Sequence, residues 1–280
     1  MLRDAAVALA AAGIDNARFE ARLLVSRAAN LSVEQLIARG RDPAPASVGT
    51  ALRLLTARRV KREPMAYILG EREFWGLPFK VTPAVLVPRP DTETLIEAAL
   101  SLMSDRRRAW RILDLGVGSG CLLLTLLKEY PNATGVGVDL SGEALEVARA
   151  NAEALGLTDR AVWTSGDWRQ EGWADRLPGP FDLVVSNPPY IEAEAVDRLM
   201  PEVARYEPRM ALEGGPDGLD AYRAIASAAC KLVTPGGHLL VEAGAGQASD
   251  IARILSSFGL KVLPFWKDLA GIERVVGAYH

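Results

Sequence analysis

Cysteine and histidine are scarce in this sequence, with two residues of each among 280. Cys121 and Cys230 lie in different apolar segments and have no CxxC partner, so we expect neither a disulfide framework nor a zinc site. His238 lies in the strand-like run GGHLLVEA, where a packing role is the expectation. Chemistry based on a metal or on histidine is therefore not predicted, and no residue is assigned to a metal.

Long apolar runs are also missing. No run approaches the roughly 20 residues that a membrane helix needs, and the first segment, MLRDAAVALAAAGID, carries acids within a short helical pattern, unlike a signal peptide. Low-complexity tracts are absent, while 49% of the residues are apolar and 24% are charged, a composition typical of ordered globular proteins. We expect a cytoplasmic protein of two domains that has no membrane partner.

Charge is unevenly distributed along the chain. Residues 1–63 contain eleven Lys or Arg against six Asp or Glu, whereas the remaining residues contain 21 against 29. An acidic second part would repel a phosphate backbone, which weakens the case for a DNA substrate. The basic first part could dock an acidic protein or RNA, or it could be a solvated helical surface.

The chain divides into three parts by pattern. Residues 1–64 have apolar residues at helical spacing and predict a small helical bundle, in which Ser32 and Gln35 make a capping box. Residues 65–90 change to short β-prone pieces broken by Gly and Pro, which predicts a linker containing a β-hairpin. Residues 91–280 predict a larger α/β domain.

Strands and helices alternate within this larger domain. A helix capped by Asp91 or Thr92 is expected to run to about Met103. Apolar, strand-like runs then follow at residues 111–115, 133–140, 161–165, 181–186, 238–243, 260–265 and 273–279. The βαβαβ order at the start predicts a doubly wound, mostly parallel, Rossmann-like sheet whose last strand is antiparallel.

A glycine-rich loop follows the first strand of this sheet, in the segment DLGVGSG that ends at Gly120. The missing Cβ atoms allow the backbone to approach a ligand closely. Asp139 ends the second strand, 19 residues after Gly120, where an acid can accept both hydroxyl groups of an adenosine ribose. The spacing GxGxG is not a P-loop, because Cys121 stands where Lys belongs, and it is not the dinucleotide pattern GxGxxG.

S-adenosylmethionine carries no phosphate and suits this tighter loop, although the glycines alone could simply form a tight turn. After the third strand, Asp167 could accept from an adenine amino group, and Trp168 could lie along the purine face or only pack. The predicted cofactor contacts are Gly116, Val117, Gly118, Ser119, Gly120, Asp139, Asp167, Trp168 and Asn187.

The tetrapeptide Asn187-Pro-Pro-Tyr190 directly follows the apolar strand at residues 181–186. In doubly wound sheets the first and fourth strands flank the topological switch point, so this turn and the glycine loop should face each other. Asn187 offers a side-chain carbonyl, and Pro188, which lacks an N–H, favours an extended backbone whose carbonyl can face a ligand. Two acceptors would orient an amide or amino NH₂ group, on which Tyr190 would stack. The predicted chemistry is methyl transfer to that nitrogen by positioning, without a strong general base.

Four blocks of the sequence resemble the release-factor glutamine methyltransferases, the HemK/PrmC family. They are GEREFWGLPFKVTPAVLVPRPDTETLIE at 70–97, ILDLGVGSG at 112–120, SNPPYI at 186–191 and YEPRMALEGGPDGLDAYRAI at 206–225. The similarity extends over nearly the whole chain. NPPY alone is shared with nucleic-acid amino methyltransferases, whereas the outer blocks discriminate between the two groups.

The resemblance implies a class I methyltransferase that uses S-adenosylmethionine and releases S-adenosylhomocysteine. It implies that the acceptor is the side-chain N5 of the glutamine in the Gly-Gly-Gln loop of class 1 peptide chain release factors, and that the N-terminal helical domain helps to grip that factor. It also implies a monomer that requires no nucleic acid. The glutamine pocket, carried over by motif, consists of Asn187, Pro188, Pro189 and Tyr190, with Arg89, Pro90 and Glu207 lining it.

Two other functions remain open from the residues alone. A nucleic-acid amino methyltransferase, acting on N2 of ribosomal RNA guanine or N6 of DNA adenine, would use the same tetrapeptide to hold a flipped base. A module that binds nucleotides or NAD would need the glycine loop but would have no use for Asn187. A basic face around the site would indicate the first alternative.

Overall fold

The computed structural model describes residues 1–39, 43 and 45–280. Two compact units divide the chain: residues 1–71 with residues 200–206 form one, and residues 72–199 with residues 207–280 form the other. Within the described ranges, every helix is too short or too polar to span a membrane. The predicted three-part division at residues 64 and 90, with a docking role for the first part, stays a prediction.

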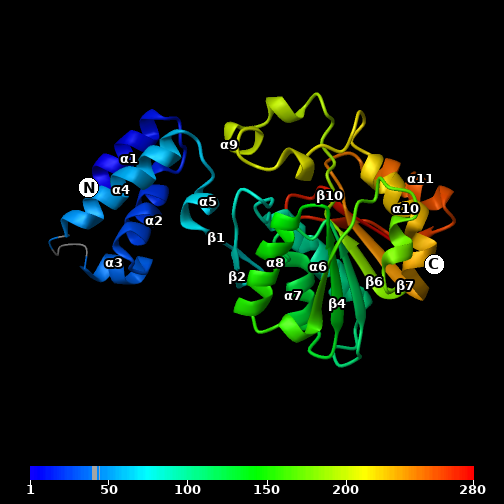
Figure 1. The fold of residues 1–280 in the computed structure, drawn as a ribbon. Coiled ribbons are helices and arrows are strands. Elements are labelled where there is room, and N and C mark those ends of the chain that lie inside the picture. The colour runs from blue at the N-terminus through cyan, green and yellow to red at the C-terminus, as the bar shows by residue number, and fades with distance from the viewer. Residues whose placement is uncertain (40–42, 44) are drawn as a thin grey trace. The chain divides into compact units, whose positions relative to one another are not determined.

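Helices make up the first unit, which Figure 1 draws in blue to cyan except for the yellow segment 200–206. They are α1 (Leu2–Ala11), α2 (Ala17–Ala29), α3 (Val33–Arg39), α4 (Ala46–Val60), α5 (Met65–Leu69) and, from the later segment, α9 (Pro201–Ala204). Leu9, Ala21, Leu24 and Leu52 are buried in their shared core, which is the apolar stripe expected of amphipathic helices. The predicted capping box is confirmed, because Ser32 N donates to Gln35 Oε1 (2.9 Å) and Gln35 N donates to Ser32 Oγ (3.2 Å).

A buried arginine fastens the segment 200–206 to the helices of this unit. Arg59 is only 6% exposed, and its guanidinium donates to Glu20 Oε2 (2.6 Å) and to Glu202 Oε1 (3.0 Å). Arg62 Nη2 donates to the other oxygen of Glu202 (2.9 Å). Charge-assisted hydrogen bonds of this kind are the stronger ones in proteins, so the segment is held by specific polar contacts.

The second unit is built on a twisted sheet of strands in the order β5-β4-β3-β6-β7-β10-β8, with β9 pairing β10. The strands are β3 (Arg111–Leu115), β4 (Thr134–Asp139), β5 (Ala161–Ser165), β6 (Phe181–Ser186), β7 (Val233–Glu242), β8 (Lys261–Val262), β9 (Trp266–Lys267) and β10 (Glu273–Tyr279). Strands β3 to β7 pair in parallel, and β10 is antiparallel to both of its neighbours β7 and β8. The predicted Rossmann-like sheet with an antiparallel last strand is confirmed.

Helices cover both faces of the sheet (Figure 1). One face packs against α6 (Glu93–Leu102), α7 (Cys121–Glu129) and α8 (Gly142–Ala154), and the other against α10 (Asp220–Leu232) and α11 (Ala248–Ser257). Alternation along β3 explains the arrangement, since Ile112 enters the first core while Leu113 and Leu115 enter the second. Continuous apolar runs in the central strands are therefore required, because both faces are buried.

The switch point of the sheet lies between β3 and β6. Leu115 and Ser186, the last residues of these strands, are partners across the ladder, and Ser186 Oγ donates to Leu115 O (2.7 Å). The glycine loop after β3 and the NPPY turn after β6 therefore start side by side. This confirms the arrangement that the strand order predicts for the switch point.

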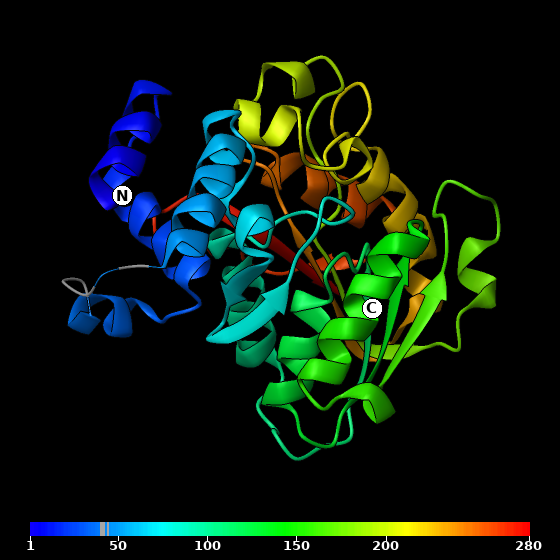
Figure 2. The ribbon, with the colours of Figure 1, turned by 60° about the vertical axis from the view of Figure 1, so that its left-hand side comes forward.

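A small hairpin, β1 (Glu71–Phe74) and β2 (Leu77–Lys80), precedes the sheet. Trp75 and Gly76 both have positive φ (53° and 70°), as the central residues of a type I′ hairpin turn require. Asn151 of α8 binds both main-chain groups of Lys80 (2.7 and 3.0 Å) and also donates to Ser119 O (2.8 Å). One amide thus joins the hairpin to the glycine loop, and β2 lies beside α8 in Figure 2.

Two local predictions are only partly right. Thr92 occupies the N-cap position of α6, as predicted, but no side chain caps the helix: a 3₁₀ turn (Pro90–Thr92) leads into α6, and the side chain of Thr92 is bonded elsewhere. The strand expected over residues 260–265 is limited to β8, because only Lys261 and Val262 find ladder partners on β10.

Candidate active site

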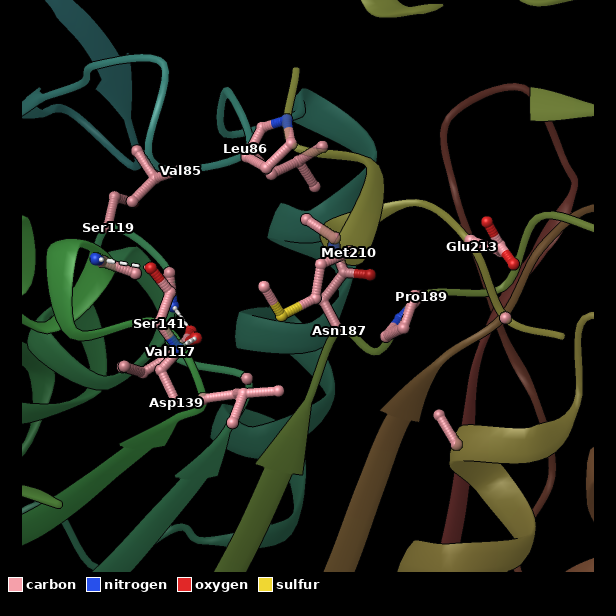
Figure 3. A pocket seen from close by; sticks show the side chains of 18 of the residues that line it. Val85, Leu86, Val117, Ser119, Asp139, Ser141, Asn187, Pro189, Met210 and Glu213 are labelled. Carbon is pink, nitrogen blue, oxygen red and sulfur yellow. Dashed lines mark hydrogen bonds between the residues drawn. The ribbon is translucent and has the colours of Figure 1, made fainter. Parts of the chain in front are cut away.

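A cavity of about 540 Å³ opens at the switch point, within the second unit (Figure 3). Its walls come from the loops that follow β3, β4, β5 and β6, together with residues of the segments 84–92 and 208–215. A cavity of this size is typical of sites for small molecules and cofactors. The carboxyl ends of the parallel strands therefore carry the site, as expected for this class of sheet.

The glycine loop is shaped by its own backbone. Gly116 and Gly118 have positive φ (74° and 52°), which favours glycine. The N–H groups of Gly116 and Val117 donate to Val138 O (2.8 and 2.9 Å), and Gly118 N donates to Asp139 Oδ2 (2.9 Å). The loop is thus tied to the end of β4 before any ligand contributes.

Asp139 lies on the cavity wall beside this loop (Figure 3). Its second carboxylate oxygen, Oδ1, accepts from Ser141 N (2.9 Å). Burial raises the pKa of Asp139, and the N–H groups of Ser141 and Gly118 oppose part of that rise. Each oxygen accepts one N–H and keeps a further lone-pair site, so the carboxylate can still receive hydroxyl groups from a ligand.

The two predicted adenine contacts also reach the cavity. Trp168 lies over the glycine loop, since a Cβ added at Gly116 would come within 3.2 Å of its indole ring. Asp167 is bonded by Arg169, whose Nε and Nη2 donate to its two oxygens (2.8 and 3.0 Å). The Arg169 hydrogen bonds lower the pKa of Asp167, so this carboxylate stays charged at the edge of the site.

The other predicted cofactor contacts of the glycine loop do not all reach the cavity. Val117, Gly118 and Ser119 line the cavity with Gly116, whereas Gly120 is not among the described residues that line it. Gly120 precedes α7 in a left-handed conformation, and a Cβ there would meet the Leu124 side chain at 3.0 Å. Gly120 thus starts the helix, and its contact with the cofactor stays a prediction.

The NPPY turn presents only part of itself to the cavity. Asn187 and Pro189 line the wall (Figure 3), while Pro188 and Tyr190 are not among the described lining residues. Tyr190 packs against the core under α10 and α11, and burial raises its pKa to about 12. The predicted stacking of Tyr190 on a substrate amide stays a prediction.

A hydrogen bond fixes one end of the Asn187 amide. Its Nδ2 donates to Thr92 Oγ1 (3.2 Å), and Thr92 also lines the cavity. The amide N–H group is therefore directed at the protein, which leaves Oδ1 as an acceptor for a ligand. Sequence reasoning gave Thr92 a capping role and missed this contact.

Close packing holds the NPPY turn from behind. A Cβ at Gly214 would come within 2.6 Å of Pro189 O and 2.9 Å of Tyr190 Cα, so only glycine fits there. Gln247 Nε2 donates to Tyr190 O (3.0 Å), and Gln247 Oε1 accepts from Gly244 N (3.1 Å). Residues 24 to 57 positions away along the chain thus set the turn, and no local sequence signal indicates them.

Arg89, Pro90 and Glu207 occupy different places. Arg89 lines the cavity, and its Nη2 donates to Glu207 Oε1 (2.6 Å). Glu207 is buried behind it and also accepts from Val87 N (3.4 Å), while burial raises its pKa in spite of Arg89. Pro90 begins the 3₁₀ turn. Glu207 and Pro90 are not among the described residues that line the cavity, and their place in a glutamine pocket stays a prediction.

Apolar residues that the sequence did not single out complete the lining of the cavity. Val85, Leu86 and Met210 line the cavity (Figure 3), and Met210 is 52% exposed. A large exposed apolar side chain at a cavity rim is suited to contact with a ligand or a partner. Within the described residues, no group of three or more His, Cys, Asp or Glu side chains could hold a metal ion.

Together, this sheet topology and a glycine loop that faces an Asn-Pro-Pro-Tyr turn define a class I methyltransferase. The Methyltransferase small domain family model matches residues 92–206, and the PrmC N-terminal domain model matches residues 1–70. The fold is similar to that of a methyltransferase from Pyrococcus furiosus, with a TM-score of 0.53 and 17% identity over 82% of this chain and 98% of that one.

Curated relatives identify the family within that class. The chain is 46% identical over 279 residues to the release factor glutamine methyltransferase of Bradyrhizobium diazoefficiens, covering 99% of this chain and 92% of the relative. It is also 46% identical over 266 residues to that of Rhodospirillum rubrum, covering 95% and 80%. The protein belongs to the release factor glutamine methyltransferase family, which confirms the resemblance seen in the sequence.

Proposed function

We propose that this protein transfers a methyl group from S-adenosylmethionine to the side-chain N5 of the glutamine in the Gly-Gly-Gln loop of class 1 peptide chain release factors. Relatives that carry the corresponding name match over nearly the whole chain. The observation that carries the proposal is Asn187, whose amide N–H₂ group is bonded to Thr92 while its Oδ1 is left to accept from a substrate NH₂ group.

The cavity fits the proposed cofactor by its chemistry. Asp139 has lone pairs available for ribose hydroxyl groups, and Trp168 lies against Gly116, where a purine could stack on it. When bound, S-adenosylmethionine supplies the methyl group as an electrophile and leaves as S-adenosylhomocysteine. Gly116, Val117, Gly118, Ser119, Asp139, Asp167 and Trp168 would hold it.

The protein's own residues orient the acceptor. Asn187 Oδ1 and a main-chain carbonyl of the NPPY turn would accept the two N–H groups of the glutamine amide, which fixes its plane and directs its nitrogen. Such positioning of two reactants can contribute several kcal/mol to rate enhancement. No strong base is required, because the nitrogen can lose its proton after transfer.

The three parts of the chain would have separate roles in docking and in catalysis. Residues 1–64 would help to dock the release factor, residues 65–90 would link the parts, and residues 91–280 would carry the chemistry. Residues 1–64 have a net positive charge, which makes them suited to an acidic partner. The protein would act in the cytoplasm as a monomer and without nucleic acid.

The test is transfer of labelled methyl from S-adenosylmethionine to purified release factor. A factor with Gln→Ala in the Gly-Gly-Gln loop and a ribosomal RNA sample serve as controls. Label on the intact factor alone would support the proposal. Label on RNA would favour the nucleic-acid amino methyltransferase alternative instead.

A further inference from the structure

A buried contact links the NPPY turn to two distant parts of the chain. The Thr92 hydroxyl accepts from Asn187 Nδ2 (3.2 Å) across 95 residues of sequence, and it also lies close enough to the Glu242 carboxyl, at the end of β7, to lower the pKa of that group. Thr92 is buried, and Glu242 is only 1% exposed. Three polar groups from three elements therefore meet beneath the acceptor site.

The chemistry of a hydroxyl group restricts how these three groups can bond. A threonine hydroxyl has one proton to donate and lone pairs with which to accept. A carboxyl oxygen of Glu242 can accept that proton whether or not the acid is itself protonated, and Thr92 then faces Asn187 only as an acceptor, which is the direction seen in the structure. Asn187 must then present Nδ2 to Thr92 and Oδ1 to the cavity, so the bonding pattern selects one of the two possible orientations of the amide.

Glu242, which faces the Thr92 hydroxyl, is surrounded by charged and titratable groups from several elements. Its Oε2 is buried and has no hydrogen-bond partner among the described residues, and the Thr92 hydroxyl opposes the rise in pKa that burial causes. Arg274, Asp91 and Arg89 act on it electrostatically from neighbouring elements, and Tyr190, Tyr222 and Cys121 are the other titratable groups that interact with it. Leaving a buried acid without a partner is costly. The position of Glu242 beside Thr92 is therefore suited to orienting the Thr92 hydroxyl.

We propose that Thr92 is a positioning residue for methyl transfer, and that it acts by fixing the Asn187 amide with its carbonyl toward the acceptor while Glu242 orients the Thr92 hydroxyl. The kinetic consequence rests on the proposed function, whereas the orientation itself does not. Loss of the hydroxyl frees the amide to turn, and an amide turned the wrong way would present a donor to the donor groups of the substrate.

Three variants separate this role from simple packing. Thr92→Val keeps the shape but removes the hydroxyl, and Thr92→Ser restores it. Thr125→Val is the matched control, because Thr125 is fully buried in the same unit and its Oγ1 has no hydrogen-bond partner among the described residues. The Thr92→Val variant should lower kcat/KM for the release factor about tenfold, the effect of one lost hydrogen bond.

The other readouts should stay nearly constant. Thr92→Ser and Thr125→Val should retain kcat/KM within about twofold of the unmodified protein, and the Kd for S-adenosylmethionine should be unchanged in all three variants. An undiminished kcat/KM in Thr92→Val would overturn the proposal. So would a loss that appears equally in Thr125→Val or that Thr92→Ser does not restore.

A second measurement needs no substrate. The side-chain NH₂ signals of Asn187, assigned by their loss in Asn187→Ala, report solvent exchange in an NMR spectrum of the ¹⁵N-labelled protein. Their exchange should be at least about tenfold faster in Thr92→Val than in the unmodified protein and in Thr92→Ser. Equal exchange would refute the positioning role whatever the substrate, whereas absence of methyl transfer by the unmodified protein would refute only the proposed function.

Discussion

Replacing Gly214 by alanine tests whether the backbone behind the NPPY turn sets the rate of methyl transfer. The added Cβ would lie 2.6 Å from Pro189 O and 2.9 Å from Gly218 O and Tyr190 Cα. All three neighbours are backbone atoms, which cannot move aside as a flexible side chain does. Gly214 is also bonded to the turn's next residue, since Gly214 N donates to Ile191 O (2.8 Å).

The expected magnitude follows from these distances. An ordinary contact is about 3.4 Å, so Pro189 O must move by roughly 0.8 Å and carry the turn with it. Overpacking of this kind destabilises a protein by about 1–3 kcal/mol, and misplacing reacting groups by about 1 Å lowers the rate about 10²-fold. We expect Gly214→Ala to lose both stability and turnover, with an unchanged Kd for S-adenosylmethionine.

Gly49→Ala is the matched control. Gly49 lies inside α4, and its added Cβ would have only ordinary contacts, at 3.5 Å or more. Alanine there should stabilise by up to about 1 kcal/mol, because glycine is unfavourable inside a helix, and turnover should stay normal. Urea unfolding and methyl transfer would be measured for both variants. Normal turnover in Gly214→Ala would refute the reasoning that the glycine maintains the turn.

Three further substitutions test the site. Asn187→Ala should lower turnover at least about 10²-fold and leave the Kd for the cofactor largely unchanged. Near-normal methyl transfer would contradict the role of Asn187 as a hydrogen-bond acceptor for the substrate. Asp139→Ala should weaken S-adenosylmethionine about 10- to 100-fold in a calorimetric titration, because a hydrogen bond to a charged group contributes about 1.5–3 kcal/mol, and an unchanged Kd would move the ribose elsewhere. Burial raises the pKa of Glu242 to about 7 from an ordinary value of 4.5. The folded protein thus keeps a proton that the unfolded chain releases, and its unfolding free energy should fall as pH rises through this window, by up to about 3 kcal/mol. Glu242→Gln removes that part of the pH dependence, so a difference between variant and wild type that is constant from pH 4 to 8 would contradict the buried, raised pKa.

Local patterns predicted the fold and the two facing loops. The glycine spacing and the proline pair act through their own backbone, and the strand order places the loops together whatever the side chains nearby. The capping box at Ser32 is similarly local, since its partner Gln35 is three residues away. Features whose partners are close in sequence were therefore predictable.

Features that depend on distant partners were not predictable. Thr92 has the residue type and position of a helix cap, but Asn187 lies 95 residues away and competes for its hydroxyl. Tyr190 packs against the core under α10 and α11, a contact that the tetrapeptide itself does not indicate. The strand expected at residues 260–265 is short because β10 pairs with it at only two positions.

The segment 200–206 has a consequence for the exchange of parts between related proteins. Although it lies in the middle of the catalytic half of the sequence, it belongs to the helical unit, where Glu202 bonds Arg59 and Arg62. A chimera that replaced only the first 71 residues would leave Glu202 without its arginine partners unless the donor carried matching ones, and a largely buried carboxylate with a missing partner is costly. The helical unit is compact in space, but its residues come from two separate stretches of the sequence. A functional chimera should therefore transfer both stretches together. In related proteins, a substitution at position 202 should be accompanied by a change at position 59 or 62.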